Sequence, residues 1–437
     1  MIVIKVGGSI LKDKEDIVSL PKIIGELNKN EKIIIIVSAL NGVTNLLIEG
    51  TKNEEEIDKI AIEVYNKYSK FISMFGYDKN SKEALLKLKR ELLKTAKMIK
   101  TEKFNQNTKN KFISYGEKMS TIVLHSILMQ NGISSIPVIN PILFTYKKQG
   151  DDLVNQKKTK AILRNAIKNN NITIVPGFIG IDKNGYSTII GRGGSDYTAT
   201  IIAKILNINK VILITDVPGI MTADPRIIDN PVTIKYLSVG EAVELAHLGA
   251  KKFHPKTFEP IINTNISVII RCLYSNNTTT ISESYQVNSL KGITFTKDLT
   301  EIKIESLNIV GRIGSASHII NLVKKCNVNI ISLAQPISET TIQIFIKKED
   351  ENRLIKELKK DQYIKKIEIN SVSAISVVGN KLSDNLTNAK MIKMAAEHNL
   401  ISFSRGINNI SSTFILDSEK GENFFYDLHD KLKKGKI

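Results

Sequence analysis

The chain has 437 residues, of which 42% are hydrophobic, 24% charged and 6% aromatic. This usage is typical of a globular protein and excludes wholesale disorder, and the length allows two to four domains at roughly 150 residues each. Lysine and arginine number 62 against 44 for aspartate and glutamate, a formal charge of +18. The excess is spread along the chain without an aromatic and basic motif, so we expect a lysine-rich surface and no nucleic-acid partner.

Features at the start of the chain and the cysteine content indicate the compartment. The segment MIVIKVGGSI lacks the basic head and cleavage site of a signal peptide. The densest apolar segment, Lys32–Leu40, is far shorter than the roughly 18 residues of a membrane span. Cys272 and Cys326 are too few for a disulfide framework or a CxxC zinc site. We therefore expect a cytoplasmic protein without a membrane partner.

The chain begins with an alternation of strands and helices. Apolar runs predict buried strands at Ile2–Val6, with Lys5 inside the run, and at Ile33–Val37, and helical spacing predicts a helix over Ile17–Leu27 between them. From Glu54 to about Asn110, lysines and glutamates surround apolar residues at helical intervals, which indicates a helical lobe. Strand, helix, strand is the rhythm of an α/β sheet.

The same rhythm resumes after the lobe. The further elements predicted here are a helix at Met119–Gln130, strands at Ile136–Ile139, Thr173–Val175, Ser187–Ile190 and Lys210–Thr215, a helix at Val239–Leu248 and a strand at Ile266–Ile270. We interpret residues 1–271 as one α/β domain that includes the helical lobe at about 54–110.

Residues 272–295, rich in Asn, Thr and Ser, are expected to form a linker. A weak repeat follows, because Val310-Gly311 recurs as Val378-Gly379. It predicts two small βαβ modules, at 296–370 and 371–437. Neither module carries a catalytic cluster, so each can sense a ligand, form an interface or be structural padding.

Two turns at strand ends are suited to anions. In Lys5-Val6-Gly7-Gly8-Ser9, the missing β-carbons let backbone amides approach a phosphate. A buried Lys5 needs a partner, and a triphosphate is one; the alternative is a tight turn with the lysine reaching solvent. The turn Ser38–Thr44 also follows a strand, where open α/β sheets bind ligands, although its hydroxyls can simply cap a helix.

The richest stretch is Gly191-Arg192-Gly193-Gly194-Ser195-Asp196. The planar guanidinium of Arg192 suits a carboxylate or phosphate. Ser195 and Asp196 are suited to begin a helix over Tyr197–Leu206, and this capping role is compatible with ligand binding. Three glycines around an arginine favour a ligand-binding loop.

The stretch from Thr215 to Arg226 again follows an apolar strand. Asp216 and Asp224 can face a ribose or a metal-bound water, and Arg226 a phosphate, although an ordinary turn is an equal alternative. Lys251 and Lys252 supply more cations, beside a His254 that we interpret as structural. No P-loop, protein-kinase catalytic loop, zinc-protease or nucleophile-elbow motif occurs, so nucleotide chemistry would need another scaffold.

The motifs together resemble one family. KVGGS, VSALNGVTN, SYGEKMS, GRGGSDYTA, TDVPGIMTADPR and GAKKFHP occur in the order found in aspartokinases of the amino-acid kinase superfamily. The two C-terminal modules are similar to the paired ACT domains that follow in that family. The resemblance implies an α/β amino-acid kinase fold, a mainly parallel sheet sandwiched by helices, followed by two ferredoxin-like ACT modules.

The activity implied by the resemblance is ATP-dependent phosphorylation of the side-chain carboxylate of L-aspartate. The product is 4-phospho-L-aspartate, the first step towards lysine, threonine and methionine. An aspartate carboxyl with a pKa of about 3.9 is already ionised, so no general base is needed. Catalysis then consists of positioning and positive charge, since two anions must meet.

The resemblance also implies residue roles. Lys5 neutralises the transferred phosphoryl group, and Asp196 orders the network around this lysine. Arg192 holds the substrate α-carboxylate and Glu117 its ammonium group, with hydrogen bonds from Ser38, Thr44 and Ser195. The implied ATP contacts are Lys5, Gly7, Gly8, Ser9, Thr215, Asp216, Met221, Arg226, Lys251 and Lys252. Mg2+ would bind through the ATP phosphates without a protein side-chain ligand.

Two positions depart from the family pattern. Ser9-Ile10 stands where Thr-Ser is common, which removes one hydroxyl, and Met221 replaces a common tyrosine, so its nucleotide contact is in question. No G-x-G-x-x-G follows the second module, and we expect no fused homoserine dehydrogenase.

Regulation is implied by the turn that carries Gln335, Ser338 and Glu339, which is similar to the family's effector-binding turn. The effector would be lysine or threonine, and the ACT modules would pair into a homodimer or higher homo-oligomer. Two alternatives remain: a kinase of the same superfamily that acts on glutamate, carbamate or UMP, and a catalytically silent amino-acid sensor.

Overall fold

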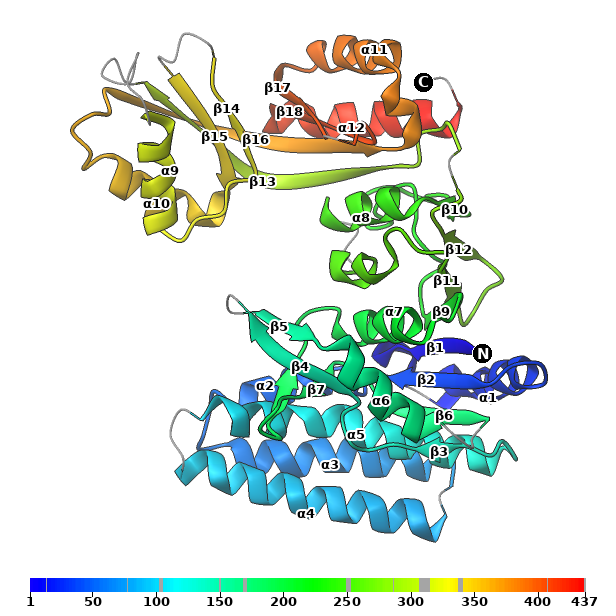
Figure 1. Ribbon diagram of the computed structural model, residues 1–437. Coiled ribbons are helices and arrows are strands. Elements are labelled where there is room, and N and C mark those ends of the chain that lie inside the picture. The colour runs from blue at the N-terminus through cyan, green and yellow to red at the C-terminus, as the bar shows by residue number, and fades with distance from the viewer. Residues whose placement is uncertain are drawn as a thin grey trace. The chain divides into compact units, whose positions relative to one another are not determined.

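The computed structural model describes residues 1–12, 14–76, 78–101, 105–148, 151–167, 171–248, 253–285, 287–305, 315–336, 341–406 and 408–435. The chain divides into two compact units (Figure 1). The N-terminal unit comprises Met1–Ile220, Thr233–Ala246 and Lys251–Gln286. The C-terminal unit comprises Met221–Val232, His247–Ala250 and Val287–Ile437.

An eight-stranded sheet forms the centre of the N-terminal unit. Its order is β10 (Tyr236–Leu237), β12 (Thr278–Ile281), β11 (Ser267–Cys272), β9 (Lys210–Thr215), β1 (Ile2–Val6), β2 (Ile33–Val37), β6 (Ile172–Pro176) and β3 (Ile136–Pro137). All neighbours pair in parallel except β11 and β12. Buried parallel strands are covered on both faces, which explains continuous apolar runs such as IIIIV in β2.

Helices and a second, small sheet complete this unit. The helices are α1 (Lys14–Asn28), α2 (Val43–Gly50), α3 (Ile57–Ser73), α4 (Lys79–Thr101), α5 (Gln106–Gln130), α6 (Gln156–Ile167), α7 (Gly194–Leu206) and α8 (Val239–His247). The small sheet has the order β5 (Asp151–Val154), β4 (Leu143–Lys148), β7 (Ile179–Ile181) and β8 (Ser187–Ile189). Short 3-10 turns are η1 (Gly8–Ile10), η2 (Pro255–Thr257) and η3 (Glu259–Ile261).

The helical lobe is built from α3, α4 and α5, which pack against one another (Figure 1). On α4, Leu85, Leu88 and Leu92 are buried at helical spacing, while Lys87 between them is exposed. Helix α5 is buried along most of its length and joins the lobe to the core of the main sheet. The lobe therefore shares one hydrophobic core with the sheet.

The stretch expected to be a linker, 272–295, contains strand β12 and the start of β13. Strand β12 pairs antiparallel with β11, and its Thr279 and Ile281 are buried. The linker prediction was wrong for these residues because Thr-rich sequence looks like a loop in composition, whereas threonine fits well on a half-buried pleated strand.

A six-stranded sheet forms the C-terminal unit. Its order is β14 (Ser332–Ala334), β15 (Thr341–Lys347), β13 (Gly292–Glu305), β16 (Lys366–Val378), β18 (Ser411–Asp417) and β17 (Leu400–Arg405). Its helices are α9 (Ser315–Lys325), α10 (Glu351–Leu358), α11 (Asn385–Ala396) and α12 (Ser418–Lys433), with the 3-10 turns η4 (Lys348–Asp350) and η5 (Asn380–Ser383).

Strands β13 and β16 run through both halves of this sheet. They pair antiparallel, with a bulge between Thr296 and Leu299. One half adds β15 and β14 and has its own core with α9 and α10; the other adds β18 and β17 and has a separate core with α11 and α12. This arrangement is consistent with two ferredoxin-like ACT modules. The predicted fold class, an amino-acid kinase fold followed by such modules, is confirmed.

Among the residues that the structure describes, no helix has the length and apolar character needed to cross a membrane.

Candidate active site

Four parallel strands end at the same edge of the main sheet. The register pairs Val6 of β1 with Val37 of β2 and with Ile214 of β9, and Val37 with Pro176 of β6. Open α/β sheets bind ligands at this carboxyl edge. The residues that follow the four strands directly are Gly7–Ser9, Ser38–Leu40, Gly177–Phe178 and Asp216.

An ion pair joins β1 to the first turn of α7. Lys5 Nζ lies 2.7 Å from Asp196 Oδ1, and the two side chains are only 13% and 11% exposed. A cation in this buried strand would be costly without a partner, and Asp196 supplies one. An ammonium group has three protons, so this pair leaves Lys5 able to donate to a further anion.

The glycine turn after β1 is in close contact with the turn after β2. A Cβ added to Gly8 would lie 2.4 Å from Ala39 O, which leaves room only for glycine. On the other side, Ser9 Oγ donates to Asp216 Oδ1 at 2.8 Å, and Thr215 Oγ1 donates to the same oxygen at 3.0 Å. The predicted residues Gly8, Ser9, Thr215 and Asp216 therefore meet at this edge.

Glu117 on α5 lies beside the second turn. It is 2% exposed, and its Oε1 accepts a long hydrogen bond of 3.4 Å from Ala39 N. Its Oε2 is buried and has no hydrogen-bond partner among the residues that the structure describes. Burial raises the pKa of Glu117 to about 8. A buried carboxyl with one unpaired oxygen is suited to receive a cationic group, which would favour its ionised form.

The loop that carries Arg192 packs on the end of β6. A Cβ on Gly177 would lie 2.7 Å from Ser195 Cβ, and one on Gly194 would lie 2.7 Å from Phe178 Cδ2. Helix α7 begins here after Gly193, so the positive end of its dipole faces this region. Arg192 itself is exposed.

Our sequence analysis missed Gly177 and Phe178. Phe178 has a φ of 65°, a left-handed conformation that is rare for a bulky residue and often marks a functional site. Its amide donates to Thr198 Oγ1 at 3.1 Å, which holds it against α7. The Pro176-Gly177 pair, where β6 ends, was the available signal.

The remaining predicted residues lie partly at this edge and partly outside it. Ser38 follows β2, and Thr44 lies in the first turn of α2; both are partly buried. Met221 and Arg226 belong to the C-terminal unit, where the Arg226 guanidinium pairs with Asp224 at 3.0 and 2.5 Å. Gln335 is exposed just after β14. Lys251, Lys252, Ser338 and Glu339 lie outside the described residues.

His254 packs against the arginine loop, since a Cβ on Gly193 would lie 2.5 Å from His254 Cβ. Its ring Nδ1 accepts a hydrogen bond from Lys256 N at 3.2 Å, which caps η2. These contacts agree with the structural role predicted for this histidine.

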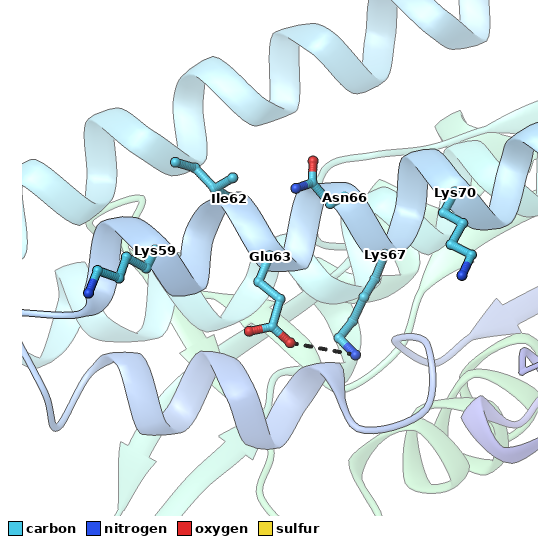
Figure 2. Close-up of a pocket in the computed structure, with 6 residues that line it drawn as sticks. All are labelled: Lys59, Ile62, Glu63, Asn66, Lys67 and Lys70. Atoms are coloured by element: carbon cyan, nitrogen blue, oxygen red, sulfur yellow. Dashed lines mark ion pairs between the residues drawn. The ribbon is translucent and has the colours of Figure 1, made fainter.

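A surface depression lies away from these strand ends, on the outer face of α3. Figure 2 shows Lys67 of this face pointing toward Glu63, at 3.6 Å. None of the predicted site residues lines it; its lining residues are Lys59, Ile62, Glu63, Asn66, Lys67 and Lys70. The strand edge, and not this depression, brings the chemistry together.

Comparison with known proteins agrees with this geometry. The family model described as "Amino acid kinase family" matches residues 1–272. The chain belongs to this family. Its relatives include aspartokinases, the family that the motifs resemble.

The chain is 26% identical to the aspartokinase of Rickettsia felis, with 99% of each covered. It is 27% identical to a bifunctional aspartokinase/homoserine dehydrogenase of Buchnera aphidicola, over 99% of the chain but 56% of that protein. The fold is similar to two crystal structures of Escherichia coli aspartokinase III, one with lysine and aspartate (TM-score 0.82) and one with aspartate and ADP (TM-score 0.79). Both are 21% identical to the chain and cover 99% of it and of themselves.

Proposed function

We propose that this chain is an aspartate kinase, which transfers a phosphoryl group from ATP to the side-chain carboxylate of L-aspartate. One observation carries the proposal. Ala39 lies between the two halves of the site, because its amide donates to Glu117 while its carbonyl packs against Gly8. A substrate ammonium at Glu117 is therefore held next to the glycine turn that would receive the phosphates.

Charge explains the chemistry. The attacking carboxylate is ionised at neutral pH, so it repels the triphosphate and needs no base. Lys5, held by Asp196, supplies positive charge to the transferred phosphoryl group, and the amides after Gly7 and at the start of α7 add to it. The barrier is lowered by charge and alignment rather than by a proton transfer.

Substrate recognition follows from the charges of aspartate itself. The unpaired Oε2 of Glu117 accepts from the ammonium group, and Arg192 pairs with the α-carboxylate. Ser38, Thr44 and Ser195 add hydrogen bonds. Glu117, once ionised, and Arg192 carry opposite charges, so together they select an amino acid over a simple carboxylate.

ATP is proposed as the co-substrate, with Gly7, Gly8, Ser9, Thr215 and Asp216 around it. For Met221, Arg226, Lys251 and Lys252, the proposal of a nucleotide contact rests on the motif resemblance alone. Asp196 is engaged by Lys5 and Asp216 accepts from Ser9 and Thr215, so the donor set suits Mg2+ held through ATP phosphates. When bound, Mg2+ would neutralise phosphate charge.

The test is an ADP-release assay with aspartate, glutamate and UMP as separate acceptors. We expect release only with aspartate and formation of an acyl phosphate that hydroxylamine traps. Release with glutamate or UMP would assign another kinase of the family, and no release with any acceptor would support a silent sensor.

Feedback by lysine or threonine and a homodimer or higher homo-oligomer through the ACT modules are part of the proposal. β14 and β17 are the edge strands of the six-stranded sheet, and open edges favour side-by-side association. Adding each amino acid to the same assay tests the effector, and light scattering tests the assembly. A monomer at working concentration would contradict the assembly.

A further inference from the structure

Tyr68 on α3 connects the helical lobe to both halves of the proposed site. It is fully buried, and its hydroxyl contacts three groups. It donates to Gly116 O at 2.6 Å, accepts from Leu40 N at 3.1 Å and lies 3.0 Å from Ser120 Oγ. Because its single proton goes to Gly116, the Ser120 hydroxyl donates to it. One phenol thus bridges the turn after β2 and helix α5.

The bond to Leu40 fixes one particular peptide plane. The Leu40 amide and the Ala39 carbonyl belong to the same peptide unit, and in a trans peptide they point in opposite directions. Tyr68 holds the N–H end, so the carbonyl end is directed at Gly8, where it makes the close approach described above. The preceding amide, Ala39 N, reaches Glu117.

The hydrogen bond to Gly116 O connects Tyr68 to helix α5, which carries Glu117. Gly116 precedes Glu117 on α5, and a Cβ on Gly116 would lie 2.9 Å from Ala39 Cβ. The helix and the turn are therefore in direct contact, with the phenol bonded to both. Loss of the hydroxyl would leave the buried Leu40 amide and Gly116 carbonyl without this partner.

We infer that Tyr68 is a positioning residue: through the Ala39–Leu40 peptide and Gly116 it sets the place of Glu117 relative to the Gly7–Gly8 turn. It touches no reacting atom in this scheme. This inference takes the identity of the substrate from the proposed function. The hydrogen-bond network of Tyr68 is independent of that proposal. A displacement of about 1 Å between the two halves is enough to cost about 100-fold in rate.

Tyr68→Phe tests this role, with Tyr115→Phe as the matched control. Tyr115 is also a fully buried tyrosine of the lobe, but its hydroxyl bonds to Thr95 of α4 at 3.3 Å, within the lobe. We expect Tyr68→Phe to lower kcat/KM for aspartate about 10- to 100-fold. The kcat/KM of Tyr115→Phe should stay within about threefold of the wild-type value. This difference between the variants should persist even if both have similar melting temperatures.

Hydrogen–deuterium exchange supplies a readout that needs no substrate. Peptides over residues 38–44 should exchange faster in Tyr68→Phe than in wild type and in Tyr115→Phe. If Tyr68→Phe folds poorly, Ser120→Ala removes only one donor to the phenol and should weaken aspartate kinetics about two- to fivefold.

The outcomes separate the two proposals. A wild-type protein without aspartate-dependent turnover overturns the proposed function, while exchange still tests Tyr68. Unchanged exchange over 38–44 in Tyr68→Phe, or aspartate kinetics equal to those of Tyr115→Phe, overturns the positioning role alone.

Discussion

Lys5 on β1 and Asp196 on α7 form a largely buried ion pair, with 2.7 Å between Nζ and Oδ1. The pair holds the ammonium at the carboxyl end of the strand, where the glycine turn begins. The positive charge of Lys5 is therefore in place before substrate binds. A preorganised charge of this kind stabilises a transition state without any rearrangement of the protein during the reaction.

Removal of this charge should abolish most turnover. Lys5→Ala is expected to lower kcat about 10²- to 10³-fold, the effect typical of losing one preorganised transition-state donor. Lys32→Ala, at an exposed lysine just before β2, is the control and should be near wild type. Steady-state kinetics and a thermal melt of each variant make the comparison. Near-normal kcat in a folded Lys5→Ala protein would refute the role.

Aspartate binding should depend on pH through Glu117. Burial raises the pKa of Glu117 to about 8, so the free carboxyl is mostly neutral at pH 7 and must lose its proton to pair with an ammonium. KM for aspartate should therefore fall almost tenfold per unit as pH rises towards 8, and then level off.

Glu117→Gln should bind aspartate more weakly and remove this pH dependence. Glu63→Gln, at an exposed residue of α3, should keep the wild-type profile. The measurement is KM for aspartate from pH 6 to 9 in all three proteins. A wild-type profile shared by Glu117→Gln would contradict the assignment of the ammonium site.

The same carboxyl should affect stability with a defined sign. The folded pKa of Glu117 is raised from 4.5 to about 8, so the folded state holds a proton that the unfolded state has lost. The stabilising contribution is present below about pH 4.5 and is lost as pH rises to 8, by up to about 1.4 kcal/mol per pH unit. Urea unfolding should show this loss in wild type relative to Glu117→Gln; parallel curves would contradict it.

The contact between the turn after β1 and the turn after β2 can be tested by substituting Gly8. Gly8→Ala places a Cβ 2.4 Å from Ala39 O, a backbone atom, so one turn must move. We expect a loss of about 1–3 kcal/mol in the free energy of unfolding, typical of overpacking, together with at least a tenfold loss of turnover. Kinetics and urea unfolding of the variant check both effects.

Gly25→Ala is the control for this substitution. Gly25 lies inside α1, and a Cβ there would meet only Ile133 Cδ1 and Cγ1, at 3.4 and 3.9 Å. Helix propensity favours alanine at such a position by up to about 1 kcal/mol. A Gly8→Ala protein as stable and active as Gly25→Ala would show that the turns do not need this close approach.

The central strands were predictable because burial on both faces leaves a visible pattern. β2 is an unbroken apolar run, and β1 and β9 are largely apolar despite Lys5 in β1 and Lys210 at the start of β9; the structure confirms all three strands. β4, β5, β7 and β12 were missed. They are short and contain polar residues or glycine, as in LFTYKK, DDLV, IGI and TTTI, so their composition alone resembles a loop.

Sequence motifs identified the residues of the site one by one, but they did not predict most of the contacts between these residues. Lys5 and Asp196 each stood out in a motif, and the resemblance associated them in one network, whereas their direct ion pair depends on β1 packing on α7. Phe178 carried no signal of its left-handed backbone. Tyr68 looks like an ordinary core residue, since only the folded lobe shows which groups its hydroxyl meets.

By itself the sequence determined the succession of the central strands along the chain, the glycines at strand ends and the charged groups available for chemistry. These features depend on local patterns of apolar residues and turns. Only the tertiary structure decided that Glu117 lies buried beside Ala39 with one oxygen unpaired, and that one tyrosine of the lobe bonds to both neighbouring segments. Burial and hydrogen-bond pairing arise between segments far apart in the chain, and no local pattern records them.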